Sequence, residues 1–430
     1  SPVVSNCVFT GNSALGTGGA VSSTSYDPAI ITASFQNCVF SENSLSPMYI
    51  GAGAAVYLRG ANTSSFTNCT FFGNTYSASS NGGAAIGMNS FGGSDDPHPV
   101  VKNCIAWGNT SFLGLGNYTT NVTYSLIQGG YAGAGNVSTN AYFVNAADPD
   151  GADNVWGTTD DGLHIMPISD ALDNGTATGA PATDIKGFSR PDGAGIDMGA
   201  YEGSFCPLTT RLYVDLGQSA SATPNGTGWG TKAFKSLNDA MYLASISLCG
   251  ITEIWVKEGT YLPERDISWN ATPADSRDKT FNLPSGVSIY GGFAGTETLL
   301  SQRNINTNIT ILDANIGTAA VTDNAYHVAY ANNVSSASRL DGFTLKNGNA
   351  NGVAGSDNKG GAIYNNRGGT NLTIANCTIT ANYATTGGAM YNNVAATGLT
   401  GSCSPTIDQC IIQNNTAGLV AGIYFFTNNT

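Results

Sequence analysis

One short block of sequence recurs along this chain, and its spacing limits the possible folds more than any other feature. Each copy is an Asn or Gln followed by Cys and then by two residues that are mostly apolar or Thr. Neighbouring cysteines are 31, 31, 35 and 33 residues apart, counted from 7 to 38, 38 to 69, 69 to 104 and 377 to 410. An irregular period of about 30 is typical of solenoids, in which each repeat forms one coil and the loops vary in length. The six copies begin at Asn6, Asn37, Asn68, Asn103, Asn376 and Gln409.

The positions around each Cys behave as columns. The residue three before it is always apolar, and the residue two after it is Phe, Ile or Ala. Alternate residues of a strand face the same side, so Cys and the residue two after it should both point inward. The apolar residue three before Cys breaks this alternation, and a bend just before Cys would restore it. Asn tolerates the left-handed conformation of a tight corner, so we predict a corner at the Asn or Gln that precedes each Cys.

A second column consists of Asn residues, which stand five positions after every one of the six cysteines. Stacked coils lie about 4.8 Å apart, so equivalent amides can hydrogen-bond along the stack as a ladder. The abundance of Asn in loops is an alternative explanation, but it does not account for a constant offset. The column comprises Asn12, Asn43, Asn74, Asn109, Asn382 and Asn415.

Glycine pairs form a further repeated block after a gap of variable length, which indicates an outer loop. Gly18, Gly82, Gly360 and Gly387 each begin a Gly-Gly-Ala sequence. Such small residues permit a close turn. They lack the strand, helix and Lys of a phosphate-binding loop. An antiparallel sandwich is the alternative for a Gly-rich all-β chain, but it would not generate identical columns at this period. We therefore predict an all-β, right-handed parallel β-helix, because parallel crossovers strongly prefer that hand.

Composition excludes several partners. Charged residues make up 10% of the chain, and 16 Lys and Arg against 29 Asp and Glu give a net charge of −13. This balance argues against nucleic acid and against anionic membrane surfaces. The chain has no apolar run of about 18 residues, so we expect no membrane span. The nine cysteines cannot all pair within the chain. We expect the stacked ones to be inward thiols, and Cys206 and Cys249 to form the one favoured disulfide.

The order of segments along the chain is unusual for one solenoid. We expect residues 1–203 to be the C-terminal half of a β-helix that ends in an Asp- and Gly-rich closing segment. Residues 204–211 form a linker, and residues 212–430 form the capped N-terminal half of the next β-helix. The cap is an amphipathic helix predicted at residues 234–244, because solenoids protect the open end of their core. Its apolar face comprises Phe234, Leu237, Met241 and Ala244.

The two ends of the chain have the sequence of neighbouring coils. Residues 404–410 align with residues 1–7 without a gap. Joining Thr430 to Ser1 would space Cys410 and Cys7 by 27 residues, 20 to the end and then 7. We expect both termini to fall inside a coil without a cap. Copies of the chain would then continue head-to-tail, either covalently in a tandem repeat, which is the favoured version, or non-covalently in a filament.

Three segments carry a resemblance to a known family. They are Asp-Met-Gly-Ala-Tyr-Glu at residues 197–202, the block at residues 283–293, and the strand at residues 253–261. With the repeated coils, they resemble the pectate-lyase-like superfamily of right-handed parallel β-helices. More narrowly, they resemble bacterial surface proteins of the choice-of-anchor Q type. The resemblance implies secretion and attachment to a bacterial cell surface, but no particular reaction, because this fold hosts lyases, hydrolases and adhesins alike.

The residues offer little for catalysis. The three histidines, His98, His164 and His327, form no Ser-His-Asp or metal-spaced pattern. His98 lies in an Asp- and Pro-rich stretch typical of a solvated loop. We therefore predict a non-enzymatic structural or adhesive repeat unit of an extracellular bacterial fibre or giant surface protein. The alternative is a protein that binds or cleaves surface polysaccharide in a groove along the coils. Four tyrosines could line such a face, although strand packing explains them equally well: Tyr57, Tyr364, Tyr391 and Tyr424.

One acidic stretch is a candidate calcium site. Ca²⁺ favours several carboxylate and carbonyl oxygens on a flexible loop turned by Gly. A solvated acidic turn is an equally good explanation, because the spacing only loosely resembles that of calcium loops. The candidate ligands are Asp148, Asp150, Asp153, Asp160 and Asp161.

Overall fold

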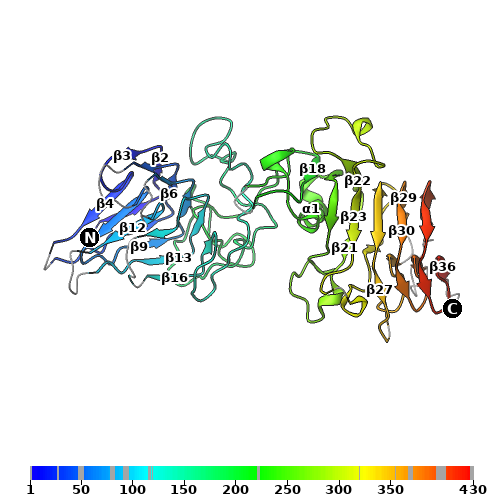
Figure 1. The fold of residues 1–430 in the computed structure, drawn as a ribbon. Helices are drawn as coiled ribbons and strands as arrows, with labels where there is room; N and C mark the ends of the chain where they lie inside the picture. The colour runs from blue at the N-terminus through cyan, green and yellow to red at the C-terminus, as the bar shows by residue number, and fades with distance from the viewer. Residues whose placement is uncertain are drawn as a thin grey trace. The chain divides into compact units, whose positions relative to one another are not determined.

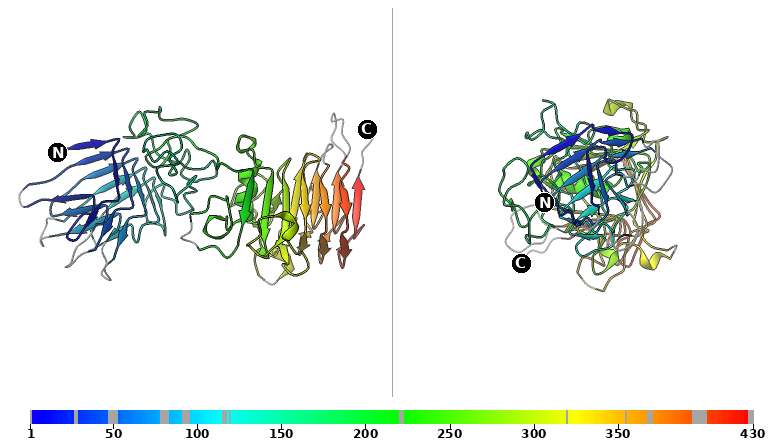
Figure 2. Two further views of the ribbon diagram at one scale, coloured as in Figure 1. Left: turned by 90° about the horizontal axis from the view of Figure 1, so that it is seen from above. Right: turned by 90° about the vertical axis from the view of Figure 1, so that its left-hand side faces the viewer.

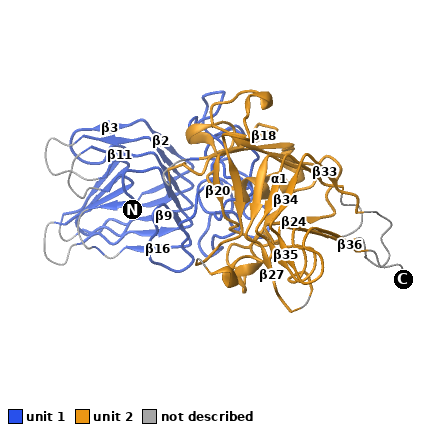
Figure 3. Ribbon diagram, turned by 45° about the vertical axis from the view of Figure 1, so that its right-hand side comes forward, with its two compact units in different colours: residues 1–206, 221–223 blue, residues 207–220, 224–430 orange. Residues whose placement is uncertain are grey.

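The chain divides into two compact units, each built almost entirely from short parallel strands. The computed structural model describes residues 2–26, 29–46, 53–77, 83–90, 96–114, 118, 120–219, 223–318, 320–353, 355–366, 371–393 and 403–426. Unit 1 comprises residues 1–206 and 221–223, and unit 2 comprises residues 207–220 and 224–430 (Figure 3). In both units, strands from successive coils lie side by side, which makes each unit a parallel β-helix (Figures 1 and 2). The predicted fold class is confirmed.

Equivalent strands of successive coils in unit 1 form four sheets, which we call faces 1 to 4 in the order that the chain meets them. Face 1 contains β1 (Val3–Ser5), β5 (Ser34–Gln36), β9 (Ser65–Thr67), β13 (Val100–Lys102) and β16 (Asn121–Thr123). Face 2 contains β2 (Val8–Thr10), β6 (Val39–Ser41), β10 (Thr70–Phe72), β14 (Ile105–Trp107) and β17 (Leu126–Ile127). Face 3 contains β3 (Ser13–Ala14), β7 (Ser44–Leu45) and β11 (Thr75–Tyr76). Face 4 contains β4 (Val21–Thr24), β8 (Val56–Arg59), β12 (Ile86–Asn89) and β15 (Leu113–Gly114).

Unit 2 repeats the same four faces. Face 1 contains β18 (Arg211–Val214), β19 (Glu253–Lys257), β22 (Ser288–Phe293), β25 (Arg339–Asp341), β29 (Thr373–Ala375) and β33 (Thr406–Asp408). Face 2 contains β20 (Gly259–Tyr261), β23 (Thr310–Asp313), β26 (Phe343–Lys346), β30 (Thr378–Thr380) and β34 (Ile411–Gln413). Face 3 contains β27 (Asn349–Ala350), β31 (Tyr383–Ala384) and β35 (Thr416–Ala417). Face 4 contains β21 (Phe281–Asn282), β24 (Ala329–Asn332), β28 (Ile363–Asn366), β32 (Met390–Asn393) and β36 (Ile423–Phe426).

The corner between faces 1 and 2 has the predicted left-handed backbone. Asn37 has a φ of 50°, Asn68 of 51° and Gln409 of 50°. The corner turns the following Cys inward, and Cys38 and Cys69 are fully buried. Both thiols belong to the interior cluster that also contains the inward phenylalanines of faces 1 and 2.

Phenylalanine rings of successive coils stack at the distance that separates the coils. The ring centroids of Phe9 and Phe40 are 4.8 Å apart with an interplanar angle of 4°, and those of Phe40 and Phe71 are 4.8 Å apart at 5°. In the strand register, Val8, Val39 and Thr70, which each follow a Cys, are direct partners on successive coils. The predicted stacking of the Cys column is therefore confirmed.

The predicted asparagine ladder is also present. In four of the six residues the side-chain amide donates to the Oδ1 of the Asn on the following coil, and the backbone N–H of the same residue donates to that oxygen as well. The Nδ2–Oδ1 distances are 2.9 Å for Asn12 to Asn43, 2.9 Å for Asn43 to Asn74, 2.8 Å for Asn74 to Asn109 and 2.9 Å for Asn382 to Asn415.

The glycine pairs make the predicted close turn before face 4. Gly360 has a φ of 64°, and a Cβ at this position would lie 2.5 Å from the carbonyl oxygen of Ile363. Only glycine fits such an approach without a shift of the backbone.

One α-helix is present among the described residues, α1 (Leu237–Ser245), which packs against β18, β19 and β21 of unit 2. The Ser236 side chain caps it by accepting from the N–H of Asp239. The predicted start at Phe234 is wrong by three residues, because Phe234 is still extended and its N–H donates to Tyr213 O at 2.8 Å. None of the described helices is long and apolar enough to cross a bilayer. Short 3₁₀ helices lie at Gly230–Lys232, Ser247–Cys249, Ser276–Asp278, Leu300–Gln302 and Val321–Asp323.

Residues 141–203, the closing segment, contain only isolated bridges and cover the outer side of face 2 in unit 1. Outward residues of the strands, such as Val39 and Ile105, pack against Phe143 and Met198 of this segment. Hydrogen bonds from the corner amides hold it in place: Asn68 Nδ2 to Asp197 O at 2.9 Å and Asn103 Nδ2 to Thr176 O at 2.8 Å. No repeated pattern in the sequence predicts this docking.

Candidate functional site

The predicted calcium ligands lie in a loop where three of the five carboxylates accept backbone N–H groups: those of Asp153, Asp160 and Asp161. Asp160 accepts from Thr158 Oγ1 at 2.6 Å and from Asp153 N–H at 3.2 Å, and the bond from the Thr158 hydroxyl lowers the pKa of Asp160. Asp161 accepts from Gly157 N–H at 2.8 Å and from Tyr201 Oη–H at 2.7 Å. Burial raises the pKa of Asp161.

The other two predicted ligands do not take part in this network. Among the described residues, the hydrogen bonds of Asp153 and Asp160 do not involve the side chain of Asp148 or Asp150. The described residues contain no group of three or more His, Cys, Asp or Glu side chains placed to hold a metal ion. Calcium binding stays a prediction from the sequence.

A buried cluster of charged residues links distant parts of the closing segment. Arg190 and Glu202 form an ion pair with both side chains fully buried, and Arg190 Nη2 donates to Gly199 O at 2.9 Å. The Asp197 carboxylate accepts the N–H groups of Asp173 and Gly203, each at 2.7 Å. Burial nevertheless raises the pKa of Asp197 to about 7. The oxygens of Glu202 and Asp197 accept hydrogen bonds from groups of the closing segment itself, so we interpret the cluster as structural.

The three histidines lie in separate environments. His164 is buried, and its ring packs at a tilt against Tyr201 and Phe205 at centroid distances of 4.4 and 4.2 Å; burial lowers its pKa to about 3. His327 is buried against Tyr364 at 5.3 Å, and its Nδ1 lies 2.9 Å from Gly360 O. Burial lowers the pKa of His327 to about 4.

The tyrosine column does not form an exposed binding face. Tyr364 is 5% exposed and Tyr391 is 3% exposed, and their ring centroids lie 5.7 Å apart. Tyr57 of unit 1 is equally buried. The suggestion of an outer aromatic surface is therefore wrong for these three residues. Ring packing between successive coils accounts for Tyr364 and Tyr391, while Tyr424 on β36 is partly buried against Tyr391 at 5.3 Å.

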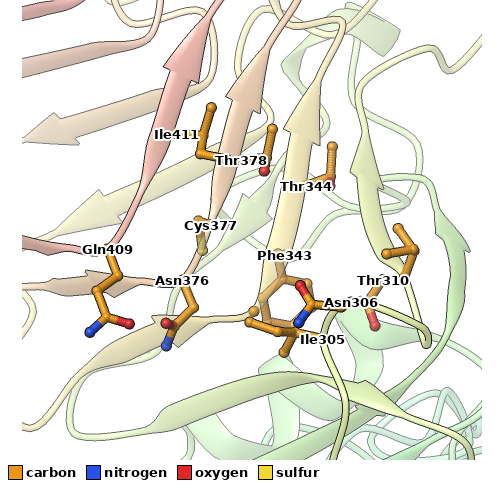
Figure 4. Close-up of a pocket in the computed structure, with 12 residues that line it drawn as sticks. Ile305, Asn306, Thr310, Phe343, Thr344, Asn376, Cys377, Thr378, Gln409 and Ile411 are labelled. Carbon is orange, nitrogen blue, oxygen red and sulfur yellow. The ribbon is translucent and has the colours of Figure 1, made fainter.

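A groove runs along the outer side of face 2 in unit 2 (Figure 4). Its cavity volume is about 290 Å³, and its lining carries no charged side chain. Amides and hydroxyls alternate with apolar groups along it. Residues that line it include Asn306, Thr344, Asn376, Thr378, Gln409 and Ile411.

Two coils lie at the ends of the sheet orders, and they carry matching strands. The first coil, residues 2–24, contributes β1 to β4, each at the edge of its sheet in unit 1. The last coil, residues 403–426, contributes β33 to β36, again each at the edge of its sheet in unit 2. Both coils carry one strand in each of the four faces, in the same order.

The first coil opens onto an apolar cavity of about 610 Å³. Inward side chains line it, including Val4, Phe9, Val21 and Phe35. Their equivalents deeper in unit 1, such as Phe40 and Val56, are fully buried.

The last coil presents apolar side chains on its open side. Phe425 is 57% exposed, although its strand partner Asn392 on the preceding coil is fully buried. Tyr424 and Phe426 pack against the ring cluster of Tyr330, Tyr364 and Tyr391. Strand alternation therefore places Phe425 on the other side of β36, toward the interior of the coil.

The asparagine ladder extends into both coils. Asn415 Oδ1 accepts from Asn382 Nδ2 at 2.9 Å, and Asn415 Nδ2 donates to Ile379 O at 2.9 Å. Asn12 donates to Asn43 Oδ1 through both its backbone N–H and its Nδ2.

Comparisons with protein-family models, with curated proteins and with solved structures found no match to this chain. The fold defines a solenoid protein of the parallel β-helix class.

The cysteines follow the expectation from their columns. Cys206 and Cys249 are disulfide-bonded, and the other seven are free thiols. Burial raises the pKa of Cys69 and Cys377, as expected for inward thiols that act as small hydrophobes.

Proposed function

We propose that this protein is a structural or adhesive repeat unit of an extracellular bacterial fibre or giant surface protein, and that copies continue head-to-tail through its first and last coils. The observation that carries the proposal is the match between those two coils. They have the same four strands in the same order, and each contains a residue of the asparagine ladder.

The physical argument rests on unprotected strand edges. An edge coil presents rows of unpaired N–H and C=O groups, and natural proteins cover or pair such edges. Solenoids commonly do so with caps. In unit 2, α1 packs beside β18, the edge strand opposite to the last coil. A coil of a neighbouring copy stacked on the last coil would cover its strand edges in the same way.

The cellular location comes from the resemblance. The sequences at residues 197–202, 253–261 and 283–293 resemble those of pectate-lyase-like β-helices and of choice-of-anchor Q surface proteins. Such a surface fibre fits a chain with few charges and an acidic net balance. Ca²⁺ bound at the acidic loop would be a cofactor of stability in this setting.

The state of assembly tests the proposal. The 430-residue chain should form linear, concentration-dependent assemblies in sedimentation velocity and negative-stain electron microscopy. Mass spectrometry of denatured material from the native source then distinguishes the two versions: a species near 44 kDa indicates a filament, and a far larger one indicates a tandem repeat. A chain that stays monomeric at every concentration, together with a native species near 44 kDa, would contradict the proposal.

The groove of unit 2 favours a second candidate, the binding or cleavage of surface polysaccharide. Its amides and hydroxyls suit the hydroxyl groups of sugars. Incubation with acidic polysaccharides, scored for binding and for new unsaturated ends, tests this candidate. Substituting Asn376 and Gln409 with Ala should weaken the binding, and an unchanged affinity would contradict it.

A further inference from the structure

The groove of unit 2 has a counterpart in unit 1 that the chain itself occupies. In unit 1, residues 197–200 of the closing segment lie on Asn68 and Thr70, at the corner before face 2 and on its outer side. The same triplet, Asn-Cys-Thr, recurs at residues 376–378 and lines the groove of unit 2. We propose that this groove binds a peptide segment of the closing-segment type, Asp-x-Gly-Ala, presented by a separate partner chain. The proposal concerns the side of the solenoid and goes beyond the head-to-tail contact.

The contacts in unit 1 define the recognition chemistry. Asn68 Nδ2 donates to Asp197 O at 2.9 Å and to Gly199 O at 3.3 Å. The N–H of Ala200 donates to Thr70 Oγ1 at 3.0 Å. All three bonds use main-chain atoms of the segment. A corner amide and a hydroxyl two residues later thus recognise a peptide backbone.

Gly199 lets the segment approach the strands closely. Its φ is 98°, in the region that favours glycine. A Cβ at this position would lie 2.8 Å from Ile105 Cδ1 and 3.0 Å from Thr70 Oγ1. Thr70 is the direct strand partner of Ile105, just as Thr378 is of Ile411, and both residues of the second pair line the groove. A peptide in the groove should therefore also need Gly at this position.

The groove of unit 2 keeps the matching polar groups unused. Within the described part of the chain, Asn376 Nδ2 donates only to Asp341 Oδ1, at 2.9 Å, which leaves its second hydrogen. Asn103 of unit 1 divides its amide in the same way, with one bond to the preceding coil and one to Thr176 O of the closing segment. The Thr378 hydroxyl has no hydrogen-bond partner among the described residues. Both groups required for the backbone contacts are thus free to bind.

The groove opens at the side of the solenoid, so it does not depend on a free coil edge. Thr344 and Thr378 lie on β26 and β30, and each of these strands has a neighbour on both sides within face 2. Ile411 continues their outward column, and Asn306 lies across the groove from it (Figure 4). The volume of about 290 Å³ is close to the lower limit of about 300 Å³ for ligand pockets, so it suits a few residues.

The burial of the closing segment indicates a separate chain as the partner. In its own unit 1, Met198 and Ala200 are buried, and Arg190 Nη2 donates to Gly199 O at 2.9 Å. Moving the segment of a second copy into the groove would break these contacts. It would also expose the apolar residues of face 2 that the segment covers, such as Val39. A free segment with the same backbone has no such cost.

A synthetic peptide with the sequence of residues 195–203, blocked at both ends, is the probe. Isothermal titration calorimetry with the full 430-residue chain should show saturable binding of one peptide per chain. A peptide with Gly199→Val should bind about tenfold more weakly or worse, because the added side chain meets the strands.

Variants of the chain locate the binding site. Thr378→Val removes the hydroxyl with little change of shape and should weaken binding by about fivefold or more, since one peptide N–H loses its acceptor. Thr378→Ser keeps the hydroxyl and should retain the affinity. The matched control is Thr380→Val on the same strand, outside the groove, which should leave the affinity unchanged. Unfolding curves that coincide with that of the unsubstituted chain show that each variant is folded.

Three outcomes would overturn the proposal. The first is the absence of saturable binding at about 1 mM peptide, whether or not polysaccharide binds to the same groove. The second is an unchanged affinity of the Thr378→Val chain. The third is weaker binding to a Thr70→Val chain but not to Thr378→Val, which would place the peptide on unit 1 in exchange for its own closing segment. Head-to-tail assembly is measured separately, so it stands or fails independently of these results.

Discussion

The side-chain amide of Asn43 donates to Oδ1 of Asn74 on the next coil at 2.9 Å, and the backbone N–H of Asn43 donates to the same oxygen at 3.0 Å. One buried acceptor thus satisfies two donors of the preceding coil. Repeated from coil to coil, this contact holds the turn between faces 2 and 3 at a constant spacing.

Asn74→Ala should therefore destabilise unit 1 by about 2–4 kcal/mol, because it leaves two buried donors of Asn43 without their acceptor. Urea unfolding followed by circular dichroism measures the change. The matched control is Asn12→Ala, since Asn12 Oδ1 accepts no described hydrogen bond and its loss should cost about 1 kcal/mol. Equal losses for the two variants would contradict the ladder's role.

The corner residue Asn68 separates backbone strain from side-chain contacts. Its φ of 51° is left-handed, and its amide donates to Asp197 O. Asn68→Ala and Asn68→Gly both remove the side chain, but Ala should be less stable than Gly by about 1 kcal/mol. Both should increase hydrogen exchange in the closing segment around Asp197. Unchanged exchange there would show that the corner amide does not anchor the segment.

The stacked phenylalanines should dominate the core energetics. Phe40 is fully buried between Phe9 and Phe71. Phe40→Ala should cost about 3–5 kcal/mol of unfolding free energy. Phe40→Leu keeps most of the volume and should cost less than about 2 kcal/mol. If the two substitutions cost the same, stacking would not be the source of the stability.

Acid should destabilise unit 2 through His327. Burial lowers the pKa of His327 to about 4, whereas an unfolded His titrates near 6.5. The unfolded chain then binds more protons between these values, so the stability is fully present above about pH 6.5 and falls as the pH drops toward 4. The loss is on the order of 3 kcal/mol. His327→Gln should flatten this part of the profile. If the unfolding free energy of His327→Gln keeps the full dependence on pH, groups other than His327 cause that dependence.

The calcium prediction can be tested at Asp160, the carboxylate that accepts from both Thr158 and Asp153. If the loop binds Ca²⁺, adding calcium to chelator-treated protein raises the melting temperature, and Asp160→Asn removes the increase. Asp96→Asn, in another acidic stretch, is the control and should keep it. A melting temperature that is independent of calcium would contradict the prediction.

The sequence by itself determined the features that repeat. The Asn corner at Asn68, the inward thiol of Cys69 and the ladder residue Asn74 each recur at a constant offset, and each has the predicted conformation or contact. The physical reason is that parallel in-register stacking places equal residues next to one another, so a column in the sequence is also a column in space. Helix α1 was predictable in type but not in its first residue, because Phe234 pairs with the strand β18 instead.

The tertiary structure alone decided the contacts that do not repeat. Asn68 and Asp197 are 129 positions apart, and nothing periodic in the sequence connects them. The burial of Tyr364 likewise depends on rings from other coils, and the hydrogen bonds of Asp161 depend on Tyr201 in the closing segment. Such contacts arise from the complementary shapes and polar groups of two surfaces that meet once in the folded chain, and those surfaces exist only after each has folded.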